Sequence, residues 1–260
     1  GRLPRRVAGV SAGASAPRAS APRAGAQRNP FEQWPDAAMG RIFELPDSVA
    51  EQVAEGLRIA VIVGDAGCGK STWLAAFGRL AERQGRPWLY RHLLREPPGE
   101  PPAGGWWLLD EAQDLRAAEL LALVERGLAD GGWLALASHR PLTRRLERLA
   151  PTLRVRLTGL RGPAETEALV ASWLAASGHE VGAWFEPAAL AQLARLGRGV
   201  PRWVVRLCYE LAEDRQPGRP ISAADVVAAE AKLRRDAPAL FLPPTRSKPC
   251  PAADPSSSLP

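Results

Sequence analysis

The stretch GDAGCGKST, residues 64–72, follows the apolar run RIAVIV at 58–63 and decides the fold of this 260-residue chain. It has the spacing of a P-loop, in which a glycine is followed after four residues by a second glycine, Lys70 and Ser71. Small residues let backbone N–H groups converge on phosphate oxygens, and the following helix adds its positive N-terminal end. The pattern predicts a nucleotide site, with Lys70 reaching the β- and γ-phosphates and the Ser71 hydroxyl binding Mg²⁺. The predicted nucleotide-binding residues are Gly64, Asp65, Ala66, Gly67, Cys68, Gly69, Lys70, Ser71 and Thr72.

Around this motif, short apolar runs alternate with helical stretches, which is typical of a parallel sheet flanked by helices. The run at 58–63 is almost continuously apolar, as expected of a strand buried on both faces. In 153–160, leucine and valine alternate with arginine, which predicts a half-exposed edge strand. Strands are expected within 58–63, 86–93, 104–115, 131–140 and 153–160, and helices over 71–85 and 117–128.

The composition divides the chain into four regions. Residues 1–29 are rich in Arg, Ala and Pro and predict a disordered tail, and residues 238–260 predict a second, Pro/Ser-rich one. Residues 30–160 carry the strand and helix alternation of a P-loop α/β domain with five parallel strands. In 161–237 the strands stop, and the pattern predicts a small helical lid of three or four helices.

The net charge of +6 lies in the N-terminal tail, because residues 1–29 hold six arginines and no acid. Two interpretations stay open: an arm that binds duplex DNA or another polyanion, and an extension with no such role, including a wrongly assigned start. The rest of the chain is neutral overall, so a DNA contact must come from a local patch or from the tail.

Three cysteines and the apolar runs bear on the compartment. Cys68, Cys208 and Cys250 are odd in number and widely spaced, which favours reduced thiols and a cytoplasmic protein. No apolar run approaches the roughly 18 residues of a membrane span, so membrane insertion is not expected.

The run WWLLDE ends in Asp110 and Glu111, at the predicted carboxyl edge of a central strand, where ligands sit in such sheets. Paired acids are also common in solvated turns, but a P-loop about 40 residues earlier favours a catalytic pair. Asp110 is then expected to hold Mg²⁺, and Glu111 to orient and deprotonate the attacking water.

Two further polar positions are candidates. The strand WLALAS ends in Ser138, which could sense the γ-phosphate, with His139 as the next choice; a polar strand end that meets a loop is an equal alternative. GVPR at 199–202 begins an amphipathic helix and places Arg202 in its first turn, from which a guanidinium can reach a phosphate.

A P-loop, LLDEAQDL, a polar strand end and GVPRWVVRLC, in that order, resemble the AAA+ ATPases of the ExeA/TniB type, which are related to the origin-recognition ATPases. The resemblance covers roughly residues 29–236, including the NPF segment at 29–31. It implies that 64–72 is Walker A and that Asp110 and Glu111 are Walker B. It further implies Ser138 as sensor 1 and Arg202 as sensor 2.

The same resemblance implies a homo-oligomer, a ring or a filament, in which a neighbour's arginine completes the site. Arg148 is our candidate for this arginine, ahead of Arg144, Arg145 and Arg154. For each of the four, a solvated surface arginine is the alternative that the sequence alone favours.

The expected function is therefore ATP hydrolysis with Mg²⁺ that switches an assembled state, in association with DNA or as a transposition or secretion accessory. The alternative is an adaptor that binds ATP to hold an unknown protein partner, with little turnover and no DNA role. DEAQ at 110–113 also occurs in superfamily 1 helicases, but 260 residues are too few for two RecA-like domains.

Overall fold

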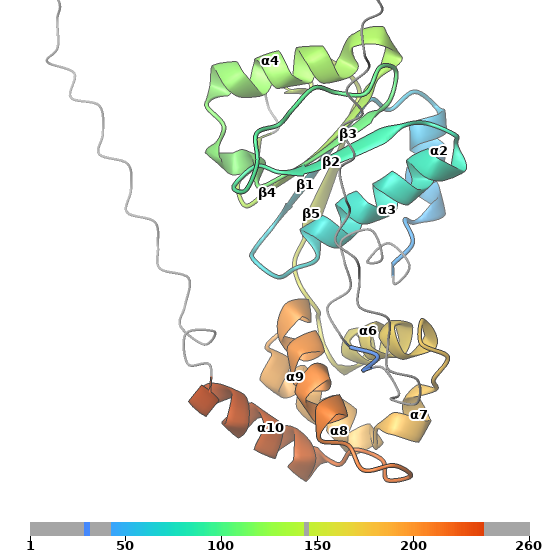
Figure 1. The fold of residues 1–260 in the computed structure, drawn as a ribbon, viewed down its shortest axis with the longest axis vertical. Helices are drawn as coiled ribbons and strands as arrows, with labels where there is room; N and C mark the ends of the chain where they lie inside the picture. Colours follow the sequence, from blue (N-terminus) through green and yellow to red (C-terminus); the bar gives the residue numbers. More distant parts are fainter. Residues whose placement is uncertain (1–28, 32–42, 143–145, 237–260) are drawn as a thin grey trace, which may run out of the picture.

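The computed structural model describes residues 29–31, 43–142 and 146–236, and these form a parallel sheet with flanking helices and a helical bundle beyond it (Figure 1). The five strands are in the order β2-β3-β4-β1-β5. Every strand pairing is parallel. The predicted α/β fold with five parallel strands is confirmed. The strands are β1 (Ile59–Gly64), β2 (Trp88–His92), β3 (Trp106–Asp110), β4 (Trp133–Ser138) and β5 (Thr152–Leu157).

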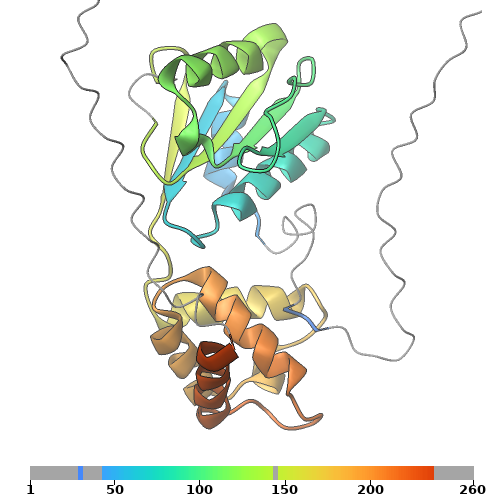
Figure 2. The same ribbon diagram turned by 60° about the vertical axis from the view of Figure 1, so that its left-hand side comes forward.

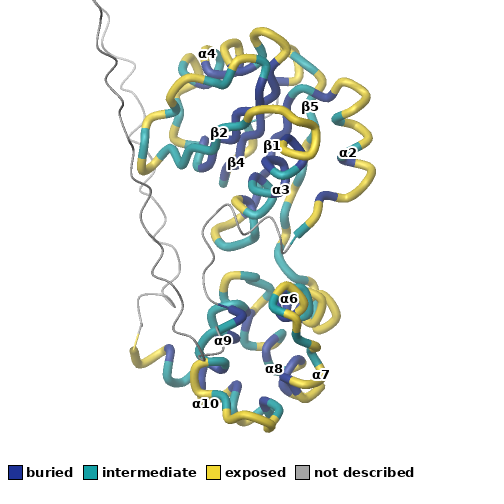
Figure 3. Tube along the Cα trace, turned by 45° about the vertical axis from the view of Figure 1, so that its right-hand side comes forward, coloured by how far each residue is buried: buried dark blue, intermediate teal, exposed yellow. Residues whose placement is uncertain are grey.

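The burial of each strand follows its place in the sheet. Strands β3 and β4 are buried along their whole length, because helices cover both of their faces. Strand β5 lies at the edge, as its alternating sequence predicted, and exposes Arg154 and Arg156. Figure 3 shows buried residues along the central strands and exposed residues on the outer side of α2.

Helices α2 (Asp47–Ala54) and α3 (Lys70–Arg83) cover one face of the sheet, and α4 (Ala117–Leu128) covers the other. On the first face, Phe77 of α3 packs on Trp133, with ring centroids 4.8 Å apart. Trp133 in turn stacks on Trp106 at 4.3 Å. These aromatic side chains fill the layer under the helix that the P-loop begins, so they help to set its position.

The described residues after β5, as far as 236, form a helical bundle with its own core (Figure 2), which we call the lid. Three or four helices were expected here, but the described residues form five, because the four-residue α7 is too short to show a helical period in the sequence. Cys208 is buried in this core, and burial raises the pKa of its thiol. The helices are α6 (Pro163–Ala175), α7 (Val181–Trp184), α8 (Pro187–Gly197), α9 (Pro201–Glu213) and α10 (Ala223–Asp236).

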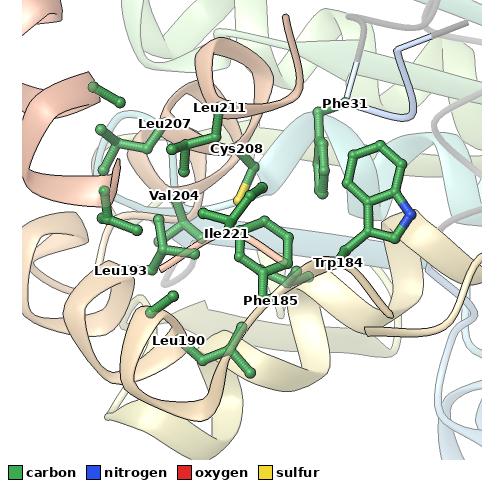
Figure 4. Packing of buried hydrophobic residues seen from close by; sticks show 14 of the residues in the cluster. Phe31, Trp184, Phe185, Leu190, Leu193, Val204, Leu207, Cys208, Leu211 and Ile221 are labelled. Carbon is green, nitrogen blue, oxygen red and sulfur yellow. The ribbon is translucent and has the colours of Figure 1, made fainter. Parts of the chain in front are cut away.

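A segment from the N-terminal side of the sheet completes the lid core (Figure 4). Phe31 is 1% exposed and stacks on Trp173, with ring centroids 6.2 Å apart. Its ring also meets Trp184 and Phe185 edge-on, each at 6.3 Å. Asn29 fixes the segment, because its Nδ2 donates to the carbonyl oxygen of Tyr209 at 3.0 Å. The lid is therefore built from two parts of the chain that lie on either side of the sheet domain in sequence.

Among the residues that the structure describes, no helix combines the length and the apolar character needed to cross a bilayer. The two predicted tails, apart from Asn29, lie outside the described residues.

Candidate active site

The P-loop connects β1 to α3, and its backbone adopts positive φ angles at two of its glycines. Gly67 and Gly69 have φ values of 81° and 96°, in the left-handed region that other residues rarely adopt. Helix α3 begins at Lys70, directly after Gly69. The loop therefore ends at the positive end of a 14-residue helix, which is a suitable place for phosphate.

Lys70 is 5% exposed, and its ammonium lies against the loop. Nζ donates to the carbonyl oxygens of Gly64 at 3.0 Å and Asp65 at 3.1 Å. No ion pair within the described part of the chain involves this lysine, and burial lowers its pKa. A buried cation that contacts carbonyl oxygens but no carboxylate fits an anionic ligand.

Ser71 and Asp110 meet where α3 begins and β3 ends. The Ser71 hydroxyl donates to Oδ2 of Asp110 at 2.5 Å. The Tyr90 hydroxyl, from β2, donates to the same oxygen at 3.1 Å. Asp110 is 1% exposed, and its carboxylate accepts hydrogen bonds from side chains of two other elements, α3 and β2.

The donor set at this point is suited to Mg²⁺. A hydroxyl and a carboxylate are hard oxygen ligands, and Mg²⁺ typically takes one or two of them together with water and phosphate oxygens. The described residues contain no cluster of three or more His, Cys, Asp or Glu side chains that could hold a metal by themselves. Ser71 and Asp110 could therefore hold Mg²⁺ only together with a phosphate ligand and water.

Glu111 has an unusual backbone for a glutamate, with φ 62° and ψ 40°. Such a left-handed conformation costs on the order of 1–3 kcal/mol and is often kept at functional sites. The side chain is 19% exposed. Its Oε2 accepts a hydrogen bond from Nε2 of Gln113 at 2.6 Å and lies 3.3 Å from Nε2 of His139.

The charges around Glu111 outweigh its burial. Burial by itself raises the pKa of this carboxyl group. The hydrogen bond from Gln113 and the nearby His139 and Lys70 lower the pKa further than burial raises it, so the net shift is downward. Glu111 is thus an ionised carboxylate at neutral pH, as a base that accepts a proton from water must be.

Ser138 and His139 end β4 beside this carboxylate, but their side chains differ in what they contact. Ser138 is fully buried. Its hydroxyl group donates to the Arg140 carbonyl oxygen at 2.7 Å, and its oxygen accepts from the Arg140 N–H at 3.0 Å. His139 instead reaches the site, with Nδ1 lying 3.3 Å from Nζ of Lys70. The side chain that joins β4 to the P-loop lysine is therefore that of His139.

Arg202 is the predicted site residue that lies in the lid, in the first turn of α9. Its backbone N–H donates to the Gly67 carbonyl oxygen at 3.3 Å, so the first turn of α9 touches the P-loop. Its positive charge also contributes to the lowered pKa of Lys70. A second contact lies at the base of the lid, where the Leu160 N–H donates to the Gly199 carbonyl oxygen at 2.7 Å.

A cavity of about 240 Å³ lies between the P-loop and the base of the lid. Its lining includes Cys68 of the P-loop, Thr158 and Arg161 of the connection to the lid, and Pro201 of α9. The cavity is adjacent to the loop that ends at Lys70, so a ligand with phosphates at the P-loop could extend into it.

The remaining predicted residues are placed as follows. Asp65 and Ala66 are exposed in the P-loop, and Thr72 is half-buried in the first turn of α3. Arg148 is exposed in a turn before β5, and Arg154 forms an ion pair with Glu147. Arg144 and Arg145 lie outside the described residues.

Two polar residues of the site were not among those predicted from the sequence. Gln113 contacts both Glu111 and the backbone of His139, whose N–H donates to its Oε1 at 3.2 Å. The feature of the sequence that could have identified Gln113 is its position two residues after Glu111. Tyr90 reaches Asp110 because β2 pairs in parallel with β3, and the register of this pairing cannot be read from the sequence.

No family model matches this sequence, and no curated protein matches it. Solved structures do resemble it. Domain III of the replication initiation protein DnaA from Thermotoga maritima has a TM-score of 0.57 and 15% identity, over 76% of this chain and 97% of that one. The RuvB Holliday junction branch migration motor from Thermotoga maritima has a TM-score of 0.54 and 20% identity, over 73% of this chain and 66% of that one.

A third similar structure is NtrX from Brucella abortus in complex with ATP, with a TM-score of 0.50 and 17% identity. The match covers 74% of this chain and 58% of the NtrX chain, so this chain spans less than two thirds of RuvB and of NtrX. These neighbours are AAA+ P-loop ATPases, and the chain has their fold.

Proposed function

We propose that this protein is a Mg²⁺-dependent ATPase. The observation that carries the proposal is the meeting of Lys70, Ser71, Asp110 and Glu111 at one edge of the sheet. The lysine supplies a buried positive charge, the serine and aspartate supply two oxygen ligands 2.5 Å apart, and the glutamate supplies an ionised base. This combination fits phosphoryl transfer to water, in which positioning and charge stabilisation do most of the catalytic work.

In the proposed reaction, the P-loop amides and Lys70 bind the phosphates and stabilise the charge that develops on them. Glu111 takes a proton from the attacking water, whose oxygen bonds to the γ-phosphorus. The bond from that phosphorus to the β–γ bridging oxygen breaks, and the products are ADP and inorganic phosphate. Ser71 and Asp110 would hold Mg²⁺, which when bound withdraws charge from the phosphate oxygens.

Arg202 gives the lid a part in this reaction. The first turn of α9, which carries Arg202, already contacts the P-loop at Gly67. The guanidinium therefore belongs to an element that touches the phosphate site. Arginine binds phosphate through strong, charge-assisted hydrogen bonds. We therefore propose that Arg202 contacts the γ-phosphate and that the lid position depends on the nucleotide. We retain Ser138 as a second candidate sensor of the γ-phosphate.

Phosphate release from the purified protein tests the ATPase. The wild type should release phosphate from ATP only when Mg²⁺ is present, and Glu111→Gln should bind ATP but lose at least about 100-fold in kcat, as expected on removal of a general base. Unchanged release in Glu111→Gln would contradict the mechanism. ATP binding without release in the wild type would favour a nucleotide-gated adaptor that holds a protein partner.

We further propose that hydrolysis switches a homo-oligomer that is associated with DNA. The six arginines of residues 1–29 support binding to a polyanion. Two structures of the same fold are described as a Holliday junction motor and a replication initiation protein. Arg148 is exposed before the edge strand, so it is available to a neighbouring subunit.

Titration of duplex DNA into the ATPase assay tests the DNA role. Stimulation that fades as salt is added would support phosphate contacts that drive assembly. A flat response with measurable basal turnover would favour a switch directed by a protein partner. For the oligomer, Arg148→Ala should lower turnover and should do so less in a mixture with Lys70→Ala, whose subunits still supply Arg148.

A further inference from the structure

His139 is placed between the two charged groups on which the proposed hydrolysis depends. Nζ of Lys70 lies 3.3 Å from its Nδ1 and 3.4 Å from its Nε2, and this Nε2 also lies 3.3 Å from Oε2 of Glu111. The imidazole comes from the end of β4, whereas the lysine comes from α3 and the glutamate from the residue after β3. One side chain thus connects three elements that meet at this edge of the sheet.

The imidazole contacts both charged groups at once. A proton on Nε2 is donated to the Glu111 carboxylate, which when ionised can only accept. The Lys70 ammonium is almost equidistant from the two ring nitrogens, so it contacts the ring as a whole. The ring therefore lies in contact with both the phosphate-binding cation and the base.

Gln113 holds the same arrangement from the other side. Its Nε2 donates to Oε2 of Glu111 at 2.6 Å, and its Oε1 accepts the backbone N–H of His139 at 3.2 Å. Within the described part of the chain, the Gln113 bond and the His139 contact both fall on Oε2. This leaves Oε1 of Glu111 as the oxygen that can accept a proton from water.

The backbone of Glu111 makes this support necessary. Its φ of 62° is unfavourable for a residue with a Cβ, and a turn of three residues follows it in η1 (Ala112–Asp114). A base must also be held within a narrow range of angles to act on a bound water. The hydroxyl of Ser138 contributes nothing to this, since it is bonded to the backbone of Arg140.

We propose that His139 is a positioning residue for Glu111, which it orients together with Gln113 and connects to the occupancy of Lys70. The inference rests on the proposed hydrolysis. A phosphate group that draws the Lys70 ammonium toward it changes the contact of the ammonium with the ring, and the change reaches the carboxylate through the same ring. The orientation of the base then depends on whether phosphate is bound.

Steady-state kinetics of two substitutions test this role. His139→Ala should lower kcat by about 10- to 100-fold, because a misplaced base loses rate in the step that it serves. KM for ATP should change by less than about threefold, because Lys70 keeps its other contacts. His139→Gln retains a side-chain donor and acceptor and should recover most of the loss in kcat.

The Glu111→Gln background separates positioning from a general effect on the fold. If His139 acts through Glu111, then His139→Ala should lower kcat in the wild type and have no further effect on the residual rate of Glu111→Gln. An equal loss in both backgrounds would overturn the proposal. Gln113→Leu should lower kcat as His139→Ala does. In the double variant, the fold-loss in kcat should be smaller than the product of the two single losses.

His179→Ala is the matched control, because this histidine lies in the lid, packed on Trp184 with ring centroids 5.1 Å apart. Its kcat should equal that of the wild type. A wild-type kcat in His139→Ala would overturn the positioning role and leave the ATPase intact. No phosphate release from the wild type would overturn the ATPase itself, and with it this inference, so the two failures are distinguishable.

Discussion

The Ser71 hydroxyl donates to Oδ2 of Asp110 at 2.5 Å, so the first turn of α3 and the end of β3 share a hydrogen bond at the expected Mg²⁺ position. Asp110→Ala removes the carboxylate from this pair. We expect it to reduce the gain in ATP affinity that Mg²⁺ provides by about 10- to 100-fold. Calorimetric titration with ATP, in Mg²⁺ and in EDTA, measures this gain directly.

Tyr90→Phe is the control for that experiment, since it keeps the ring and removes the hydroxyl that donates to Oδ2 of Asp110. One such hydrogen bond contributes about 0.5–1.5 kcal/mol, so the affinity in Mg²⁺ should fall by no more than about 10-fold. Equal losses in Asp110→Ala and Tyr90→Phe would show that Asp110 acts by packing and not by binding the metal.

The lowered pKa of Lys70 predicts how ATP binding varies with pH. Burial disfavours the charged ammonium, so Lys70 loses its proton below the ordinary lysine pKa of 10.5. The charged form binds phosphate, so the affinity for ATP in EDTA should be highest below the lowered pKa and decline as pH rises through it. A dissociation constant that stays constant up to pH 10.5 would contradict this expectation.

Lys70→Arg is informative in the same titration, because a guanidinium keeps its charge throughout this range. Its affinity can differ from that of the wild type, but its dependence on pH should be flat. The buried charge of Lys70 also destabilises the folded wild-type protein. Between the lowered pKa and 10.5 the folded protein loses this proton while the unfolded chain keeps it, so the free energy of unfolding should rise with pH in that range.

Gly67→Ala tests the contact between the lid and the P-loop. A Cβ at this position would lie 3.0 Å from Cβ of Arg202 and 3.1 Å from Cγ1 of Val200, and φ is +81°. We expect weaker ATP binding and a loss of about 1–2 kcal/mol from the backbone strain, with a further loss from the displaced lid. Chemical denaturation and nucleotide titration give the two quantities.

Gly56→Ala matches the backbone strain without the contact. Gly56 has φ +106°, and nothing lies within 4 Å of a Cβ built there. It should lose a similar amount of stability from strain and bind ATP as the wild type does. If Gly67→Ala and Gly56→Ala bind ATP equally well, the contact between the P-loop and α9 does not contribute to the site.

Phe31→Ala tests the completion of the lid core. Replacing a buried phenylalanine by alanine typically costs about 3–5 kcal/mol, and the ring here is surrounded by three aromatic side chains. Hydrogen exchange should therefore become faster in α6 and α7. The matched change is Phe43→Ala, because Phe43 packs on Trp73 of α3 at 5.2 Å and should loosen the sheet domain instead.

Several features of this protein were predictable because local chemistry determines them. The P-loop is a spacing of residue types, and its flanking strand and helix follow from an apolar run and a helical period. The edge position of β5 followed from the alternation of Arg154 and Arg156 with apolar residues. The position of Asp110 beside the P-loop was predictable because carboxyl ends of parallel strands meet at one edge of the sheet.

Other features depend on which segments meet, and the sequence carries no local sign of these. Tyr90 reaches Asp110 through the register of β2 on β3. Phe31 enters the lid core through a contact that no periodicity describes. His139 and Ser138 are neighbours at a strand end, and only the position of the Arg140 backbone shows that Ser138 is bonded there, whereas His139 contacts Lys70.

The anchoring of Asn29 to Tyr209 also has a consequence for how the chain reaches its native state. The two residues are 180 positions apart, so this contact closes nearly the whole length of the described chain. During synthesis, residues 29–31 leave the ribosome before the sheet can form, but their partners in α6, α7 and α9 are made much later. Contacts of such long sequence separation form slowly. The first described residues to be synthesised are therefore among the last to become ordered.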